Sequence, residues 1–217
     1  MPYSQMHNFA DLSKIKSAMF IGAHADDVEI GAGGLLLRLV RESPGVEIVY
    51  VVLSGDVQRH AEATSAATAF SQGAGTLHLK LAGFTDRFFP SEHTLIKQYF
   101  DQLKLDFKPQ LVVCHRSHDA HQDHRVVNEL VYNTFRSHAV MEYEVPKWDG
   151  DLTTPNVYVP LSDELATQKA ELLMEHFGSQ RSKHWFDLET FRGLMRLRGI
   201  ECNAKYAEGF HVRKMVI

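Results

Sequence analysis

A polar cluster that directly follows an apolar strand constrains this chain more than any other feature. Residues 18–21 are wholly apolar, residues 23–29 read Ala-His-Ala-Asp-Asp-Val-Glu, and glycines at positions 31, 33 and 34 precede a helical pattern over residues 35–40. This order predicts a buried strand, a sharp loop and a helix, with the polar residues at the carboxyl end of the strand. Ligands bind at that end in open α/β sheets, and two adjacent carboxylates beside a histidine are costly to bury as mere packing. The cluster therefore predicts a metal site.

Strand-like and helix-like segments then alternate along the chain. Apolar, β-branched runs predict strands covered on both faces, and apolar residues at helical spacing predict the helices between them. The expected strands are residues 46–53, 76–81 and 111–114, and the expected helices are residues 59–70, 93–107 and 126–132. Such alternation favours right-handed βαβ crossovers. We therefore expect an α/β fold with a Rossmann-like, mostly parallel sheet and helices on both faces, in a single domain spanning residues 1–217.

From about residue 139 onward the pattern is weaker and predicts a C-terminal part of the same domain. Strands are expected at residues 141–145, 157–159 and 210–217, a loop at 148–155, and helices at 165–177 and 191–197.

The composition excludes several classes of partner. The net charge is −4 and no block of lysines or arginines stands out, which argues against nucleic acid and anionic lipid and favours a small molecule. No apolar run is long enough to cross a bilayer, and the first residues lack the features of a signal peptide, so we expect a cytoplasmic protein without a membrane span. A chain of this size is also compatible with a homo-oligomer.

A second polar cluster follows the strand predicted at residues 111–114. Residues 115–125 contain four histidines and two aspartates, and both clusters should open onto the same edge of a parallel sheet. His121 and His124 are three residues apart at the start of a helix, so their rings can project into one site. His115 and His118 are weaker candidates, because loop histidines of this kind are usually solvated.

The two clusters together supply the ligands of a catalytic metal. Zinc used in catalysis is typically held by three nitrogen or oxygen ligands, and His24, Asp27 and one histidine of the second cluster would complete such a set. Iron, cobalt or manganese would also be accommodated.

Two other interpretations of the first cluster are weaker. Asp26 and Asp27 could simply cap the following helix, but one aspartate suffices for that and the second cluster stays unexplained. A dinucleotide-binding turn would need glycine at position 36, where the sequence has Leu36, and three acidic residues would repel a pyrophosphate.

Taken together, these motifs resemble the PIG-L/LmbE family of zinc-dependent N-acetylglucosamine deacetylases. The family motif A-H-P-D-D-x-E matches residues 23–29 with Ala25 in place of proline, and the motif H-x-D-H matches residues 121–124. Weaker likenesses lie at residues 59–62 (R-x-x-E), at residues 169–180 (K…H-x-S-Q) and at residues 207–210 (A-E-x-F).

The resemblance implies a role for each matching residue. His24, Asp27 and His124 would bind Zn²⁺, or another divalent metal such as Fe²⁺, and Asp26 would be the general base. His121, in its protonated form, would assist at the oxyanion or at the leaving amine, and Asp123 would orient it. Arg59 would contact the sugar, while Glu29 and Glu62 would be supporting residues.

The resulting hypothesis is a zinc-dependent hydrolase that removes the N-acetyl group from an N-acetyl amino sugar or its conjugate and releases acetate. One alternative is a metal-dependent hydrolase of another N-acyl small molecule. Another is a non-catalytic module that binds a small ligand on the same fold, although a pure binder needs no base such as Asp26 beside its metal.

Overall fold

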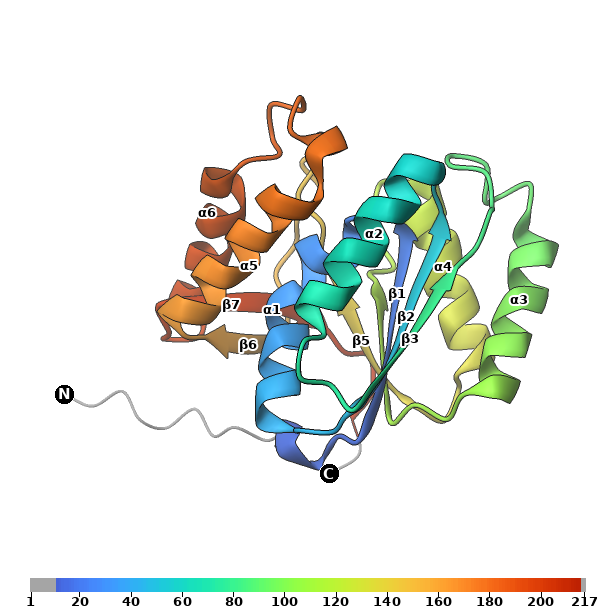
Figure 1. The fold of residues 1–217 in the computed structure, drawn as a ribbon, viewed down its shortest axis with the longest axis horizontal. Helices are drawn as coiled ribbons and strands as arrows, with labels where there is room; N and C mark the ends of the chain where they lie inside the picture. Colours follow the sequence, from blue (N-terminus) through green and yellow to red (C-terminus); the bar gives the residue numbers. More distant parts are fainter. Residues whose placement is uncertain (1–10, 216–217) are drawn as a thin grey trace.

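A seven-stranded sheet forms the centre of the molecule (Figure 1). The structure is a computed structural model, and it describes residues 11–215. The strands are β1 (Ser17–His24), β2 (Glu47–Ser54), β3 (Thr76–Leu81), β4 (Leu111–His115), β5 (Ala139–Tyr143), β6 (Val157–Leu161) and β7 (Tyr206–His211). Their order in the sheet is β3-β2-β1-β4-β5-β7-β6, and the first five are parallel to one another, whereas β7 is antiparallel to both of its neighbours. The Rossmann-like, mostly parallel α/β sheet expected from the sequence is confirmed.

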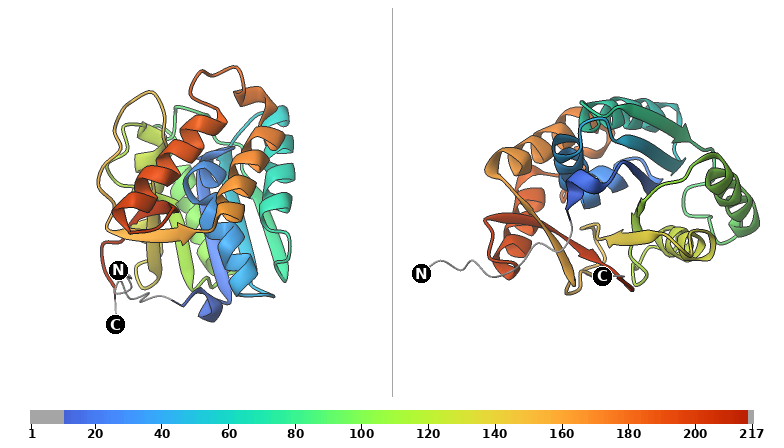
Figure 2. Two further views of the ribbon diagram at one scale, coloured as in Figure 1. Left: turned by 90° about the vertical axis from the view of Figure 1, so that its left-hand side faces the viewer. Right: turned by 90° about the horizontal axis from the view of Figure 1, so that it is seen from below.

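Helices cover both faces of this sheet (Figure 2). They are α1 (Asp27–Glu42), α2 (Val57–Phe70), α3 (His93–Asp106), α4 (Gln122–Thr134), α5 (Asp163–His176) and α6 (Leu188–Glu201), with short 3-10 turns η1 (Leu12–Lys14) and η2 (Gly178–Gln180). Alternate residues of β1 separate two apolar cores: Phe20 packs with α1, α2, α5 and α6, and Met19 and Ile21 pack with α3 and α4. Both faces of the central strands are therefore buried, which explains their nearly continuous apolar sequences.

The boundaries of several elements differ from the sequence expectation; β5 lies two residues earlier than expected, and α4 and α6 are longer at both ends. Two further differences, in α1 and β7, matter most. Helix α1 begins at Asp27 and includes the glycines, so the sharp loop after β1 is only Ala25 and Asp26. Strand β7 begins at Tyr206 and ends at His211, whereas a strand was expected over residues 210–217, of which the last two lie outside the described part of the chain. The register explains the earlier start, because Tyr206 pairs with Leu161 of β6.

A buried ion pair ties the C-terminal part to α1. Lys169 of α5 and Glu208 of β7 are 2.6 Å apart, and both are almost fully buried. The Glu208 carboxylate accepts hydrogen bonds from the backbone N–H groups of Gly34 and Leu35, and Lys169 donates to the carbonyl of Ile30. Within residues 11–215, no helix combines the length and the apolar character needed to cross a membrane.

Candidate metal centre and active site

The loop between β1 and α1 presents two carboxylates at the edge of the sheet. Asp26 occupies the N-cap position of α1 with a left-handed backbone (φ 97°), and its side chain makes no capping hydrogen bond. Asp27 accepts a hydrogen bond from the backbone N–H of His24 at 2.7 Å. Because neither aspartate side chain caps α1, helix capping does not account for this pair. A left-handed non-glycine residue is strained and often marks a functional position.

Three donor groups converge beside this loop, on His24, Asp27 and His124. The Nδ1 atom of His24 is 3.3 Å from an oxygen of Asp27 and 3.3 Å from Nε2 of His124. His124 Nε2 is 3.5 Å from the other Asp27 oxygen. Ligands at a tetrahedral zinc, about 2.0–2.1 Å from the ion, are separated from one another by about 3.3–3.4 Å. The separations between these donor atoms are close to that value, although the two histidines approach different oxygens of Asp27. The three residues are one of the groups of the described residues that could hold a metal.

Each candidate histidine ligand has a carboxylate at its other ring nitrogen. Nε2 of His24 is 3.2 Å from Asp123, and Nδ1 of His124 is 3.1 Å from Asp119. Carboxylates in this position fix the orientation of a metal-bound imidazole and raise its basicity. Asp86, on the loop after β3, lies 3.0 Å from the same nitrogen of His24.

The electrostatics of the three donors match the binding of a cation. Burial and the neighbouring His115 lower the pKa of His124 to about 3, so its ring is neutral. Burial opposes ionisation of Asp27, but the surrounding histidines hold its pKa well below the usual range. Burial also disfavours a charged His24, yet Asp27, Asp123 and Asp86 raise its pKa well above the usual value. These carboxylates favour a positive charge beside them, which either a proton on His24 or a bound metal cation would supply.

Asp26 is beside the donors but belongs to none of the candidate metal-binding groups. Its carboxylate accepts a hydrogen bond at 3.1 Å from Arg59, which also donates to the carbonyl of Ala25. Arg59 therefore reaches the site from the first turn of α2. Burial raises the pKa of Asp26 to about 7, an effect that Asp27 reinforces and the positive charges of Arg59 and Lys183 reduce.

His121 lies in the site in a different state from the one expected. Its Nδ1 atom accepts a hydrogen bond at 3.2 Å from the backbone N–H of Asp123 and so caps α4. Burial and the nearby His24 lower the pKa of His121, which favours the neutral ring. The Asp123 carboxylate faces His24 and accepts hydrogen bonds from the backbone of Arg87 and Phe89, and no described hydrogen bond joins it to His121.

The two supporting glutamates have separate places. Glu29 is buried in the first turn of α1, and burial raises its pKa to about 8. Glu62 of α2 accepts hydrogen bonds from the backbone N–H and the hydroxyl of Ser179, so it connects α2 to η2.

The expectation that His115 is solvated is wrong. His115 is the last residue of β4 and is fully buried, whereas His118 is exposed. The Nε2 atom of His115 lies 3.2 Å from Asp27 and accepts a hydrogen bond at 3.0 Å from the backbone N–H of Ala23. Its ring stacks on that of His124, with centroids 3.7 Å apart. One signal for this burial was present in the sequence, the apolar run of residues 111–114. The buried strand β4 extends one residue beyond that run and so places His115 beneath the site.

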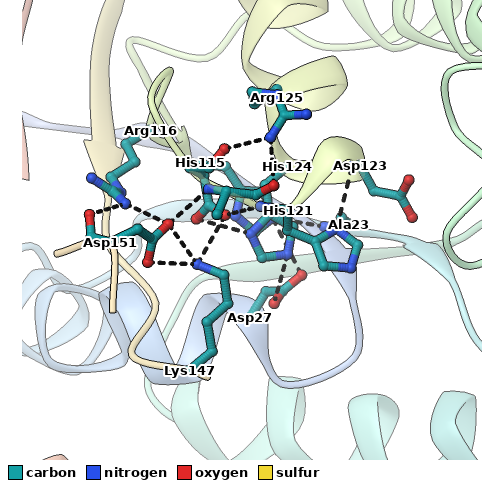
Figure 3. A network of polar contacts seen from close by, with 12 residues as sticks. Ala23, Asp27, His115, Arg116, His121, Asp123, His124, Arg125, Lys147 and Asp151 are labelled. Carbon is teal, nitrogen blue, oxygen red and sulfur yellow. Dashed lines mark hydrogen bonds and ion pairs between the residues drawn. The ribbon is translucent and has the colours of Figure 1, made fainter. Parts of the chain in front are cut away.

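Sequence reasoning also missed Asp119, Asp86 and Lys147. Lys147, on the loop after β5, is 2.9 Å from Asp119, whose other oxygen faces His124 (Figure 3). Asp119 was visible within the second cluster, but nothing in its spacing distinguishes a buried carboxylate from a solvated one. Lys147 lies on the loop after another strand, β5, and belongs to none of the sequence motifs, so nothing in the sequence connected it with the site.

Comparisons with known proteins agree with this arrangement. The PIG-L family, described as GlcNAc-PI de-N-acetylase, matches residues 19–135, which is more than half of the chain and includes every candidate metal ligand. A protein of Escherichia coli (strain K12) described as uncharacterized deacetylase YaiS is 29% identical over 177 residues, which are 76% of this chain and 92% of that protein.

Two solved structures share the fold. The N,N′-diacetylchitobiose deacetylase from Pyrococcus horikoshii has a TM-score of 0.71 at 18% identity, with 93% of this chain and 85% of that chain covered. GalB, the 4-carboxy-2-hydroxymuconate hydratase from Pseudomonas putida KT2440, has a TM-score of 0.72 at 16% identity, with 94% and 98% covered. Because these two enzymes catalyse different reactions, the fold alone does not identify the chemistry.

Proposed function

Because the chain belongs to the PIG-L family of de-N-acetylases, we propose that it removes the N-acetyl group from an N-acetyl amino sugar or its conjugate and releases acetate. One observation carries this proposal: a triangle of candidate metal donors, formed by His24, Asp27 and His124, lies beside Asp26, a buried carboxylate outside the triangle. A binding module would need the triangle but not the additional carboxylate. The description of the E. coli relative as a deacetylase, and the identity of the P. horikoshii protein as a diacetylchitobiose deacetylase, support an N-deacetylase.

His24, Asp27 and His124 would hold the metal, with Zn²⁺ as our first choice and Fe²⁺ as the alternative. When bound, such an ion would supply Lewis-acid polarisation of the amide carbonyl and of a water molecule. Asp119 and Asp123 would keep the two imidazoles oriented.

Asp26 would act as the general base. It would take a proton from the attacking water and pass it to the leaving nitrogen, so that the amide C–N bond breaks with the amine neutral. A base works best when its pKa is close to the working pH, and burial brings the pKa of Asp26 to about 7. Arg59 holds this carboxylate in place and would also offer its remaining N–H groups to sugar hydroxyls.

His121 would stabilise the oxyanion as a neutral donor. Since its Nδ1 atom accepts the Asp123 N–H, the neutral ring carries its proton on Nε2, which is then available to donate. This replaces the protonated histidine expected from the sequence and needs no ion pair with Asp123. Loss of such a donor typically lowers turnover by about 10²–10³-fold.

The test is acetate release with matched measurements of metal content. The protein, loaded with Zn²⁺ or Fe²⁺, is incubated with N-acetylglucosamine, its nucleotide conjugate, short chito-oligosaccharides and, as the rival class, N-acetyl amino acids. We expect release from the amino sugars. His124→Ala should lose the metal, whereas Asp26→Asn should keep it while turnover falls by about 10²–10⁴-fold.

Two results would count against the proposal. Acetate release from N-acetyl amino acids alone would show that the substrate is another N-acyl compound and not an amino sugar. An Asp26→Asn variant with wild-type turnover would remove Asp26 from the mechanism.

A further inference from the structure

The side chain of Arg213 joins two elements that flank the second polar cluster. Arg213 follows β7, and its guanidinium donates one hydrogen bond at 2.7 Å to Glu142 of β5 and another to Asn128 of α4. The same group lies over the ring of Tyr132, with the guanidinium carbon 3.6 Å from the ring centre. Arg213 is partly exposed, whereas both acceptors are buried. We call Arg213, Asn128 and Glu142 the C-terminal clamp.

The two acceptors of the clamp hold the backbone where β4 ends. Nδ2 of Asn128 donates a hydrogen bond at 2.7 Å to the carbonyl of His115, the last residue of β4. The second oxygen of Glu142 accepts a hydrogen bond at 2.8 Å from the backbone N–H of Ser117. A guanidinium carries donors only, so Arg213 keeps the amide oxygen of Asn128 toward itself and the NH2 group toward His115.

The end of β4 matters because the His115 ring lies against two of the candidate metal donors. Its ring stacks on that of His124 at 3.7 Å between centroids, and its Nε2 atom is 3.2 Å from Asp27. The other ring nitrogen, Nδ1, is buried and has no hydrogen-bond partner within residues 11–215. No contact on that side fixes the ring, so its position depends on the backbone that carries it. A displaced His115 would therefore press on both His124 and Asp27.

Helix α4 gives the clamp a second connection to the same donors. His124, Asn128 and Tyr132 are spaced four residues apart, so their side chains lie along one face of α4. Asn128 is one turn beyond His124, and Arg213 covers Tyr132 one turn further on. The clamp thus fixes α4 against the end of β4, which is where His124 and His115 stack.

From these contacts we infer that Arg213 is a positioning residue for the candidate metal centre, because through Asn128 and Glu142 it holds the His115 ring against His124 and Asp27. The inference rests on the proposed function and adds a requirement from outside residues 19–135, the part of the chain that matches the family. None of the contacts of Arg213 within residues 11–215 is with a candidate metal donor. Its loss should therefore change metal affinity first.

The experiment measures the Zn²⁺ affinity of the whole chain by competition with a chelator, at a temperature where circular dichroism shows every variant to be folded. We expect Asn128→Ala and Arg213→Ala each to weaken the affinity about tenfold, the lower end of the effect of partners behind metal ligands. The double variant should lose little more than either single variant, because Arg213 acts through Asn128. Independent effects would instead multiply to about a hundredfold loss.

Two further variants separate positioning from general destabilisation. Lys214→Ala is the matched control, because Lys214 is the next residue and donates a hydrogen bond at 2.6 Å to the backbone carbonyl of Arg136, away from the clamp. It should bind Zn²⁺ like the wild type. Arg213→Lys keeps a positive charge for the buried Glu142, so it should fold even if Arg213→Ala does not. An ammonium lacks the planar fork that serves both acceptors, so we expect the same loss of about tenfold in affinity.

The visible absorption of the Co²⁺-loaded protein is a second readout, because it depends on the arrangement of the ligands around the ion. The spectrum should change in Asn128→Ala and Arg213→Lys but not in Lys214→Ala. Wild-type affinity and spectrum in both of the first two variants, or a loss of about a hundredfold in the double variant, would overturn the inference and leave the proposed function intact. A wild-type protein that binds no divalent metal would contradict both.

Discussion

If His124 binds a metal as proposed, we expect Asp119 to strengthen that binding through its contact with the other ring nitrogen of His124. The Asp119 carboxylate is buried, lies 3.1 Å from His124 Nδ1 and is paired with Lys147. Asp119→Asn should weaken metal binding by about 10–100-fold, as expected for loss of a carboxylate behind a histidine ligand. The measurement is a competition titration with a chelator of known affinity. Asp151→Asn is the matched control, because Asp151 contacts Lys147 but not His124; equal losses in both variants would refute the role.

Arg59 should set the acidic limb of the pH–rate profile. Burial raises the pKa of Asp26, and the Arg59 charge opposes that rise. Arg59→Gln removes the charge but keeps a donor for Asp26, so the pKa of Asp26 should increase further. The base would then ionise only at higher pH, and the acidic limb of kcat/KM should move upward. An unmoved limb, or one shifted to lower pH, would show that Arg59 does not act on the base.

At the scale of single residues, the sequence identified the candidate ligands more readily than the residues around them. His24, Asp27 and His124 lie in motifs at the end of strand β1 and after strand β4, and the structure brings them together. His115 and Asp119 could not be ranked, because their importance comes from burial against His124. That burial depends on where β4 ends and on a lysine from a distant loop.

Among the elements, α1 depends on its glycines for contact with the sheet. A Cβ atom on Gly31 would lie 2.2 Å from the ring of Tyr143 and 2.9 Å from the carbonyl oxygen of Glu144. The Tyr143 ring cannot easily move, because it is fully buried and its hydroxyl is hydrogen-bonded to Ile21. The glycine at this position therefore allows α1 to pack closely against the sheet.

Gly31→Ala should lower the free energy of unfolding by about 1–3 kcal/mol, the usual cost of overpacking a core. Gly193→Ala is the matched control, since Gly193 lies within α6 and an added Cβ would meet nothing within 4 Å. That variant should instead gain about 0.4–1 kcal/mol. Urea denaturation of both variants provides the measurement, and a Gly31→Ala protein as stable as the wild type would contradict the packing argument.

For the whole molecule, the parallel half was predictable and the C-terminal half was less so. Strands β1, β2 and β4 have apolar runs, β3 alternates apolar and polar residues, and all four have local βαβ connections, so the sequence pattern located them. Strands β5, β7 and β6 pair antiparallel, with β7 inserted between two strands that precede it in the chain. Their pairing depends on contacts between distant segments, which short strands do not encode locally. The likeness noted at residues 207–210 marked Glu208 without revealing its partner.

The pair of Lys169 and Glu208 should decide whether the two halves unfold together. Glu208→Gln would leave the buried Lys169 ammonium without its counter-charge and place an amide beside two backbone N–H donors, so we expect a loss of about 3–5 kcal/mol. Adding Lys169→Met removes the unpaired charge and should recover part of that loss.

Lys205→Met, which breaks an exposed ion pair with Asp163, is the control and should cost less than about 1 kcal/mol. Denaturation followed by circular dichroism and by tryptophan fluorescence measures these effects, because both tryptophans lie in the C-terminal half. If Glu208→Gln unfolds with wild-type stability and the double variant gains nothing, the ion pair does not connect α1 to the C-terminal strands energetically.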